Sequence, residues 1–183
     1  MKKWIIAILV VGIIFLSFMS SYNSLVINAE NVNGKWSQVE NQLQRRTDLI
    51  PNLVETVKGF AAQEKSIFTE VADARAKLAG AQTVGEAAEA NQAVTGALGR
   101  LLAIVENYPQ LKSDANFRAL QDELAGTENR LATARKDYND AVQVYNANIK
   151  RFPTMIYAKM FSFAPSEYFQ TTEEAKNAPK VSF

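Results

Sequence analysis

The side chains of this chain that could do chemistry are carboxylates, amines and phenols, because the sequence contains no histidine and no cysteine. Without histidine, the usual general base near neutral pH is missing, and so are the Ser-His-Asp triad and the Glu-x-x-His di-iron motif. Without cysteine there is no thiolate nucleophile, disulfide, Cys-ligated zinc or lipidated cysteine anchor. A site built from carboxylates, lysine or tyrosine stays open. We nevertheless predict a protein without enzymatic activity, catalytic residues or cofactor.

Metal binding would need oxygen ligands, and three pairs of acidic residues lie close together in the sequence. They are Glu70 with Asp73, Asp122 with Glu123, and Asp137 with Asp140. Hard cations accept such all-oxygen ligand sets, but no loop has the spacing of a calcium site. Charges on helix faces are ordinarily solvated surface, so we predict no metal site.

Arg46 falls on an apolar stripe, whereas Arg45 lies beside it. Three interpretations stay open: Arg46 reaches solvent, it forms a buried ionic layer, or it contacts a ligand or partner. A charge on such a stripe needs a partner, and polar groups there often fix helix register. We predict a structural polar layer. Its members are Arg46, Asp48, Thr127, Glu128, Asn129 and Asn148.

The pairs Tyr138-Asn139 and Tyr145-Asn146 recur at heptad spacing. A stacking platform for nucleic-acid bases would need a basic groove, and the net charge is only +1. We therefore interpret the tyrosines as core residues whose hydroxyls reach the edge of the fold, and we expect no nucleic-acid partner.

These residues follow an uncharged run that begins at Trp4 and continues past Tyr22. As a helix, Trp4 to Tyr22 spans roughly 28 Å, close to the ~30 Å of a bilayer core, with an aromatic residue at each interface. A cleaved signal peptide is the alternative, but Phe18 and Met19 interrupt any small-x-small cleavage pattern. We predict a retained single-pass anchor over residues 1–22. Lys2 and Lys3 place the N-terminus in the cytoplasm and the rest outside it.

Residues 23–153 show apolar positions three and four apart, which is typical of long helices with coiled-coil-like seams. We expect a break near Pro51 with Asp48 as a helix cap, and a loop at 80–85 followed by a Thr83–Glu86 capping box. Pro109 should end the next helix, Ser113 or Asp114 should cap the last one, and Pro153 should end it. The expected fold is all-α, an antiparallel three- or four-helix bundle after the transmembrane helix.

Residues 154–183 combine an apolar aromatic segment, ending near Phe163, with a polar tail. The aromatic segment could cap the open end of the bundle, or it could be exposed and contact lipid or a second subunit.

Several stretches together resemble the LemA family. They are residues 45–59 (RRTDLIPNLVETVKG), 100–112 (RLLAIVENYPQLK), 123–130 (ELAGTENR), 138–142 (YNDAV), and Phe152-Pro153 followed by 161–163 (FSF). The resemblance covers essentially the whole chain in the family's order. It implies a bacterial inner-membrane protein with an N-terminal anchor and a helical bundle, and no established enzymatic activity. Some relatives are implicated in magnetosome membrane formation, and others neighbour membrane proteases.

Two functions of different classes follow from these features. The first is a self-associating scaffold that organises or shapes the membrane, with membrane lipid and other copies of the chain as partners. The second is an adaptor that docks a membrane protease or another membrane enzyme; a carboxylate-metal hydrolase is the least favoured reading. Six apolar residues are the predicted oligomer or lipid contacts. They are Leu25, Ala29, Val32, Trp36, Phe161 and Phe163.

Overall fold

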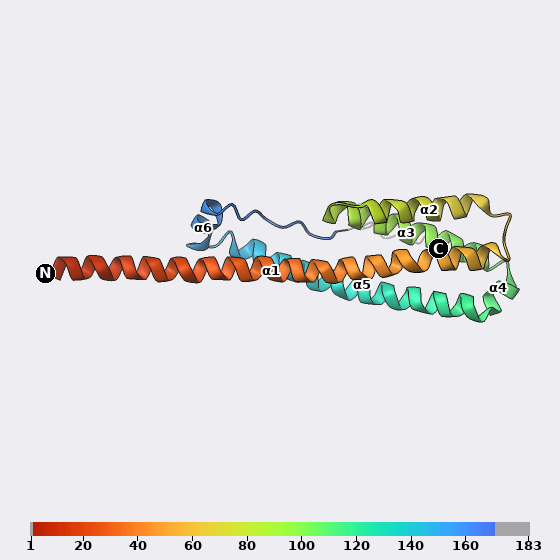
Figure 1. The fold of residues 1–183 in the computed structure, drawn as a ribbon, viewed down its shortest axis with the longest axis horizontal. Coiled ribbons are helices and arrows are strands. Elements are labelled where there is room, and N and C mark those ends of the chain that lie inside the picture. Colours follow the sequence, from red (N-terminus) through yellow and green to blue (C-terminus); the bar gives the residue numbers. More distant parts are fainter. Residues whose placement is uncertain (1, 171–183) are drawn as a thin grey trace, which may run out of the picture. The chain divides into compact units, whose positions relative to one another are not determined.

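The computed structural model describes residues 2–170, and this part of the chain contains six helices and no strand (Figure 1). The all-α prediction is therefore confirmed. The predicted polar tail from residue 171 onward lies outside the described residues. The helices are α1 (Lys2–Lys58), α2 (Lys65–Gly80), α3 (Val84–Val105), α4 (Pro109–Ser113), α5 (Ala115–Asn148) and α6 (Thr154–Met160).

The described chain forms two compact units. Unit 1 is built from residues 2–37 and 136–167, and unit 2 from residues 38–135 with 168–170. The long helices α1 and α5 contribute to both units.

The predicted helix break near Pro51 is wrong, because α1 continues through Pro51 to Lys58. A proline inside a helix has no N–H for the carbonyl four residues earlier, here that of Thr47. Arg75 of α2 supplies the missing donor: its Nε donates to the Thr47 carbonyl oxygen at 2.9 Å. The helix therefore continues across the proline, and the actual break is the turn of residues 59–64, which opens with Gly59.

The helix caps of the structure agree with the sequence prediction better than the break near Pro51 does. Thr83 and Glu86 form a complete capping box at the start of α3. Of the two candidates for α5, Asp114 is the cap, since its Oδ1 accepts from the Phe117 amide at 2.9 Å. Pro109 opens the short helix α4, whereas α3 already ends at Val105.

The core of unit 2 is apolar and draws on all five helices of that unit. In this unit α1 and α5 run antiparallel, as the contacts Gln42–Arg130 and Arg45–Glu123 show. Helices α2 and α3 pack on one another, and an ion pair between Glu70 and Arg100 joins them. The largest fully buried side chains of the unit 2 core include Ile50, Leu53, Val57, Val71, Val94, Leu101, Leu111, Phe117 and Leu131.

In unit 1, α1 and α5 are again antiparallel. Asn148 Nδ2 donates to Ser24 Oγ at 2.9 Å, and the rings of Trp36 and Tyr138 lie 5.3 Å apart. Leu25 and Val32 are buried here, with 0% and 4% of their surface exposed. The chain itself thus covers Leu25 and Val32, which corrects the expectation that these two residues are left for a second copy.

A segment without regular structure, residues 164–167, runs along α5 in unit 1. Tyr145 Oη donates to the Ala164 carbonyl at 2.9 Å, and Tyr138 Oη donates to that of Glu167 at 2.7 Å. Asn146 exchanges two hydrogen bonds with the Ser166 backbone. Burial raises the pKa of Tyr138 to about 12, so this donor stays protonated at physiological pH. The heptad tyrosines therefore hold the segment in place.

The first part of α1 is uncovered. Within the described residues, α1 is the one helix long and apolar enough to cross a membrane: its most apolar window has a mean hydropathy of 2.5, and none of it is buried. Trp4, Ile8 and Leu16, for example, each expose more than half of their surface.

We predict that Pro51 and Arg75 are energetically coupled. Arg75→Ala should destabilise the full-length protein by about 1–3 kcal/mol, because the Thr47 carbonyl loses its charged donor. In a Pro51→Ala background the new amide at position 51 can serve that carbonyl, so the same Arg75→Ala change should cost clearly less. Urea unfolding followed by circular dichroism in mild detergent measures both costs.

The matched control is Lys77→Ala, an exposed lysine on the same helix. Its effect should add to that of Pro51→Ala without coupling. An Arg75→Ala cost that is the same in both backgrounds would contradict our account of the continuous helix.

Candidate functional site

The polar cluster of unit 2 is centred on Arg46, whose side chain is 6% exposed. The helical rhythm of α1 points this arginine inward with Val39, Leu43 and Leu53, which are all buried. Burial lowers the pKa of Arg46, and the carboxylate of Glu128 opposes that shift.

Three side chains from two other helices meet the Arg46 guanidinium. From α5, Glu128 Oε2 lies 2.6 Å from Nη1. From α3, Asn91 Oδ1 accepts from Nη1 at 2.7 Å and Thr95 Oγ1 accepts from Nη2 at 3.0 Å. One cation therefore joins α1, α3 and α5, and a guanidinium with its planar fork of donors suits that task better than a lysine.

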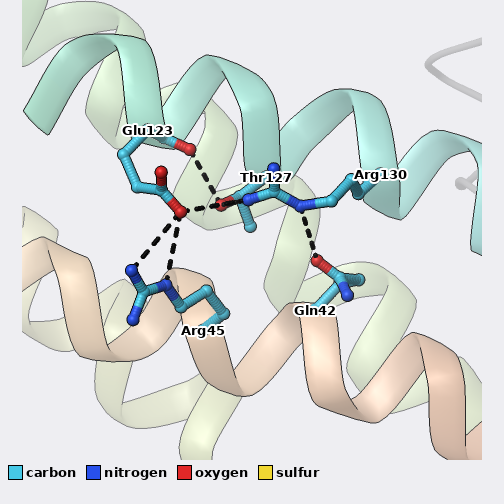
Figure 2. Close-up of polar contacts among 5 residues, drawn as sticks. All are labelled: Gln42, Arg45, Glu123, Thr127 and Arg130. Carbon is cyan, nitrogen blue, oxygen red and sulfur yellow. Dashed lines mark hydrogen bonds and ion pairs between the residues drawn. The ribbon is translucent and has the colours of Figure 1, made fainter. Parts of the chain in front are cut away.

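Beside this centre lies a more exposed network, drawn in Figure 2. Arg45 of α1 and Arg130 of α5 converge on the same oxygen, Glu123 Oε1, at 3.4 and 3.1 Å. Arg130 Nη2 also donates to Thr127 Oγ1, and its Nε donates to Gln42 (Figure 2). Because the charged groups here are between 39% and 56% exposed, each pair contributes little.

The structure brings together some of the predicted polar-layer residues and separates others. Arg46 contacts Glu128, and Thr127 is fully buried next to it in sequence, with its hydroxyl donating to the Glu123 carbonyl. Asp48 is exposed on the far side of the helix turn and accepts from Gln44 at 2.9 Å. Asn129 is exposed as well.

Asn148 belongs to unit 1, where it bonds to Ser24, so it is not a member of the Arg46 cluster. The layer we predicted from the sequence is thus smaller: Asp48, Asn129 and Asn148 do not join it, and Thr127 bonds within the neighbouring Arg130 network. The reason is rotation about the helix axis for Asp48 and Asn129, which follow buried positions by one or two residues.

Sequence reasoning missed Asn91 and Thr95. A signal was present for Asn91, since it follows the buried Ala87 by four residues and precedes the buried Val94 by three. A polar side chain on an otherwise alanine-rich buried face needs a partner. Arg46 is the charged residue that supplies it.

Four of the six carboxylates considered for metal binding, Glu123 among them, pair with basic side chains instead. Glu70 pairs with Arg100, Asp137 with Lys35, and Asp140 with Lys136. Within residues 2–170, no three acidic side chains gather as a metal site would require.

Among the six predicted oligomer or lipid contacts, the structure distinguishes buried from exposed residues. Ala29 and Trp36 are half-buried, in the same stripe of α1 as the buried Leu25 and Val32. Phe161 is 43% exposed, and its ring lies 5.1 Å from that of Tyr22. Phe163 is half-buried, with its ring 6.2 Å from that of Tyr22.

The sequence model of the LemA family matches residues 35–183 of this chain. The chain belongs to the LemA family. The matched range contains the Arg46 cluster, whereas the apolar start of α1 precedes it.

Individual relatives agree with this membership. Magnetosome protein MamQ 2 of Paramagnetospirillum magneticum is 32% identical, over 91% of this chain and 71% of the relative. Magnetosome protein MamQ of Magnetospirillum gryphiswaldense is 31% identical, over 84% of this chain and 66% of the relative. Protein LemA of Metamycoplasma hominis is 20% identical, over 91% and 76% of the two chains.

We predict that Arg46→Ala destabilises the full-length protein far more than Arg45→Ala. Removing Arg46 leaves a buried carboxylate oxygen and two polar side chains without their cation, which typically costs ~3 kcal/mol or more. Arg45 makes exposed contacts, whose loss should cost no more than about 1 kcal/mol. Urea midpoints of the two variants, read by circular dichroism in the same detergent, provide the comparison.

Glu128→Gln tests the same cluster from the other partner and should fall between the two arginine variants, because the amide still accepts a hydrogen bond. Small and equal shifts for Arg46→Ala and Arg45→Ala would show that the cluster does not hold the three helices together.

Proposed function

We propose that this protein is a membrane-anchored, self-associating helical scaffold that organises or shapes the bacterial membrane. One observation carries the proposal. The apolar start of α1 is uncovered, and the packing of unit 1 begins at Phe18 and Tyr22, where that apolar run ends. A helix that crosses a bilayer over this run would hold the rest of unit 1 directly at the membrane surface.

The polar groups of unit 2 support a structural role rather than catalysis. Arg46 is neutralised by Glu128 and held by two neutral side chains. A catalytic group would need a partner that leaves it free to exchange a proton or attack a substrate. The two MamQ relatives are named as magnetosome proteins, and this supports a role for the present protein in organising a membrane.

Self-association cannot use Leu25 and Val32 as expected from the sequence, since both are covered within the chain. The apolar surface of α1 that remains includes Val26 and Ile27, which are 42% and 66% exposed. They lie just beyond Tyr22, so the contact between copies would run along the membrane-spanning part of α1 and its first turn outside. Copies confined to one bilayer meet at high effective concentration, so a modest interface would suffice.

For localisation we propose the inner membrane of a bacterial cell, with a single span. Lys2 and Lys3 favour an N-terminus in the cytoplasm, so the parts of both units that follow Tyr22 would lie outside it.

The self-association is tested by cysteine cross-linking, for which the cysteine-free chain is well suited. Ile27→Cys in native membranes should give a covalent dimer on mild oxidation, because a disulfide needs Cβ atoms about 4 Å apart. Glu106→Cys, an exposed position in the turn between α3 and α4, is the control and should stay monomeric.

Mass photometry of the full-length protein in nanodiscs gives the subunit number independently. A monomer there, together with equal cross-linking at Ile27→Cys and Glu106→Cys, would contradict the scaffold. The adaptor for a membrane protease or another membrane enzyme would then take its place.

A further inference from the structure

Helix α6 and its flanks form a small lobe in unit 1, here called the interfacial lobe and comprising residues 150–163. Its aromatic rings pack on α1 at the end of the apolar run: Tyr157 lies 5.3 Å and Phe161 5.8 Å from Phe18, and Phe163 lies 6.2 Å from Tyr22. Figure 1 shows α6 beside the first half of α1. The lobe is thus held level with the last turns of the predicted span.

One face of the lobe turns large apolar side chains away from the protein. Thr154 and Ala158 are buried against unit 1, whereas the opposite face of α6 presents the large apolar residues. These are Met155, Ile156 and Met160, at 39%, 48% and 65% exposure, together with Phe152 at 78% in the preceding turn. An apolar face of this kind, on a helix fixed at the level of a bilayer surface, is typical of an interfacial contact with lipid.

A sharp turn keeps the lobe in this position. Ser162 has a positive φ of 59°, and the Phe163 amide donates to the Ala158 carbonyl at 2.9 Å. This is the Schellman arrangement that reverses the chain after a helix. It lets Phe161 and Phe163 reach α1 while the opposite face of α6 stays exposed.

The charge of this region has one sign. The lobe contains Lys150, Arg151 and Lys159, and the sequence has no acidic residue anywhere from 141 to 166 or from 4 to 29. Lys150, Arg151 and Lys159 are exposed. Basic residues that border an apolar face strengthen attachment to negatively charged lipid.

We propose that the interfacial lobe binds anionic phospholipid headgroups of the bilayer in which the chain is anchored. Met155, Ile156 and Met160 enter the headgroup boundary, and the basic residues contact the lipid phosphates. The inference rests on the membrane placement of α1 in the proposed function and adds the class of lipid. Lys150, Arg151 and Lys159 do not bear on the orientation of the span, because that rule counts residues close to the span in sequence.

The lipid contact is tested on the full-length protein in nanodiscs loaded with one copy per disc. A fluorophore on Ile156→Cys should be quenched by spin-labelled lipid and protected from aqueous iodide. At equal mole fraction, spin-labelled phosphatidylglycerol should quench several-fold more than spin-labelled phosphatidylcholine. This is the expected size of the effect, because each basic residue near the surface can strengthen the binding of anionic lipid by roughly fivefold.

Neutralising the lobe separates charge recognition from simple proximity. Lys150→Gln, Arg151→Gln and Lys159→Gln together should bring the ratio of the two lipids to about one, as expected when the charge attraction is gone. The matched control removes three exposed lysines of unit 2 instead, with Lys65→Gln, Lys77→Gln and Lys112→Gln, and should leave the ratio unchanged. Equal circular dichroism of the two triple variants excludes unfolding as the cause.

A second probe on Val10→Cys reports the anchor alone. No lipid quenching at either position would defeat the membrane placement of α1. Lipid quenching at Val10→Cys with iodide quenching at Ile156→Cys would overturn only the lipid contact of the lobe. If protection at Ile156→Cys requires two or more copies per disc, the lobe forms a subunit contact and the proposed lipid contact is wrong. Equal quenching by both lipids would overturn recognition of the anionic headgroup.

Discussion

The burial of one cation, Arg46, is the constraint on which the organisation of unit 2 depends. Its guanidinium is satisfied only when α1, α3 and α5 stand at the register that brings Asn91, Thr95 and Glu128 to it together. A slip of one residue along any of these helices would rotate a partner by about 100° and leave a buried charge unmet. Apolar seams tolerate such slips far better, because leucine and alanine contacts have little directional preference.

A second constraint of the same kind acts on the backbone. Pro51 removes one hydrogen bond from α1, and Arg75 restores a partner for the orphaned Thr47 carbonyl. The sequence predicts the defect at Pro51, since every interior proline has it. It does not predict the replacement donor, because Arg75 lies on another helix, 28 positions after Thr47. Only tertiary packing brings the Arg75 side chain to the Thr47 carbonyl. The predicted break was wrong for this reason.

The other predictions divide in the same way, between features set by neighbouring residues and contacts between residues distant in sequence. Local features were accessible: the helical class, the Thr83 capping box, a cap at Ser113 or Asp114 and the inward position of Arg46 all follow from short spacings. Partners distant in sequence were not, apart from Glu128. The heptad tyrosines Tyr138 and Tyr145 signalled polar groups in need of acceptors, but the acceptors are backbone carbonyls of an irregular segment.

The membrane-proximal end shows what these constraints mean for association. Had the stripe of Leu25 and Val32 been open, a neighbouring copy would have been the natural way to bury it. Unit 1 buries it internally and exposes apolar surface elsewhere: on the apolar run of α1, at Val26 and Ile27 just after it, and on the outer face of α6. The rings of α6 contact Phe18 and Tyr22, so its outer face lies near the end of the apolar run. Much of the surface that the fold leaves uncovered is therefore apolar surface that a bilayer can cover, and a contact between copies on this surface would compete with lipid.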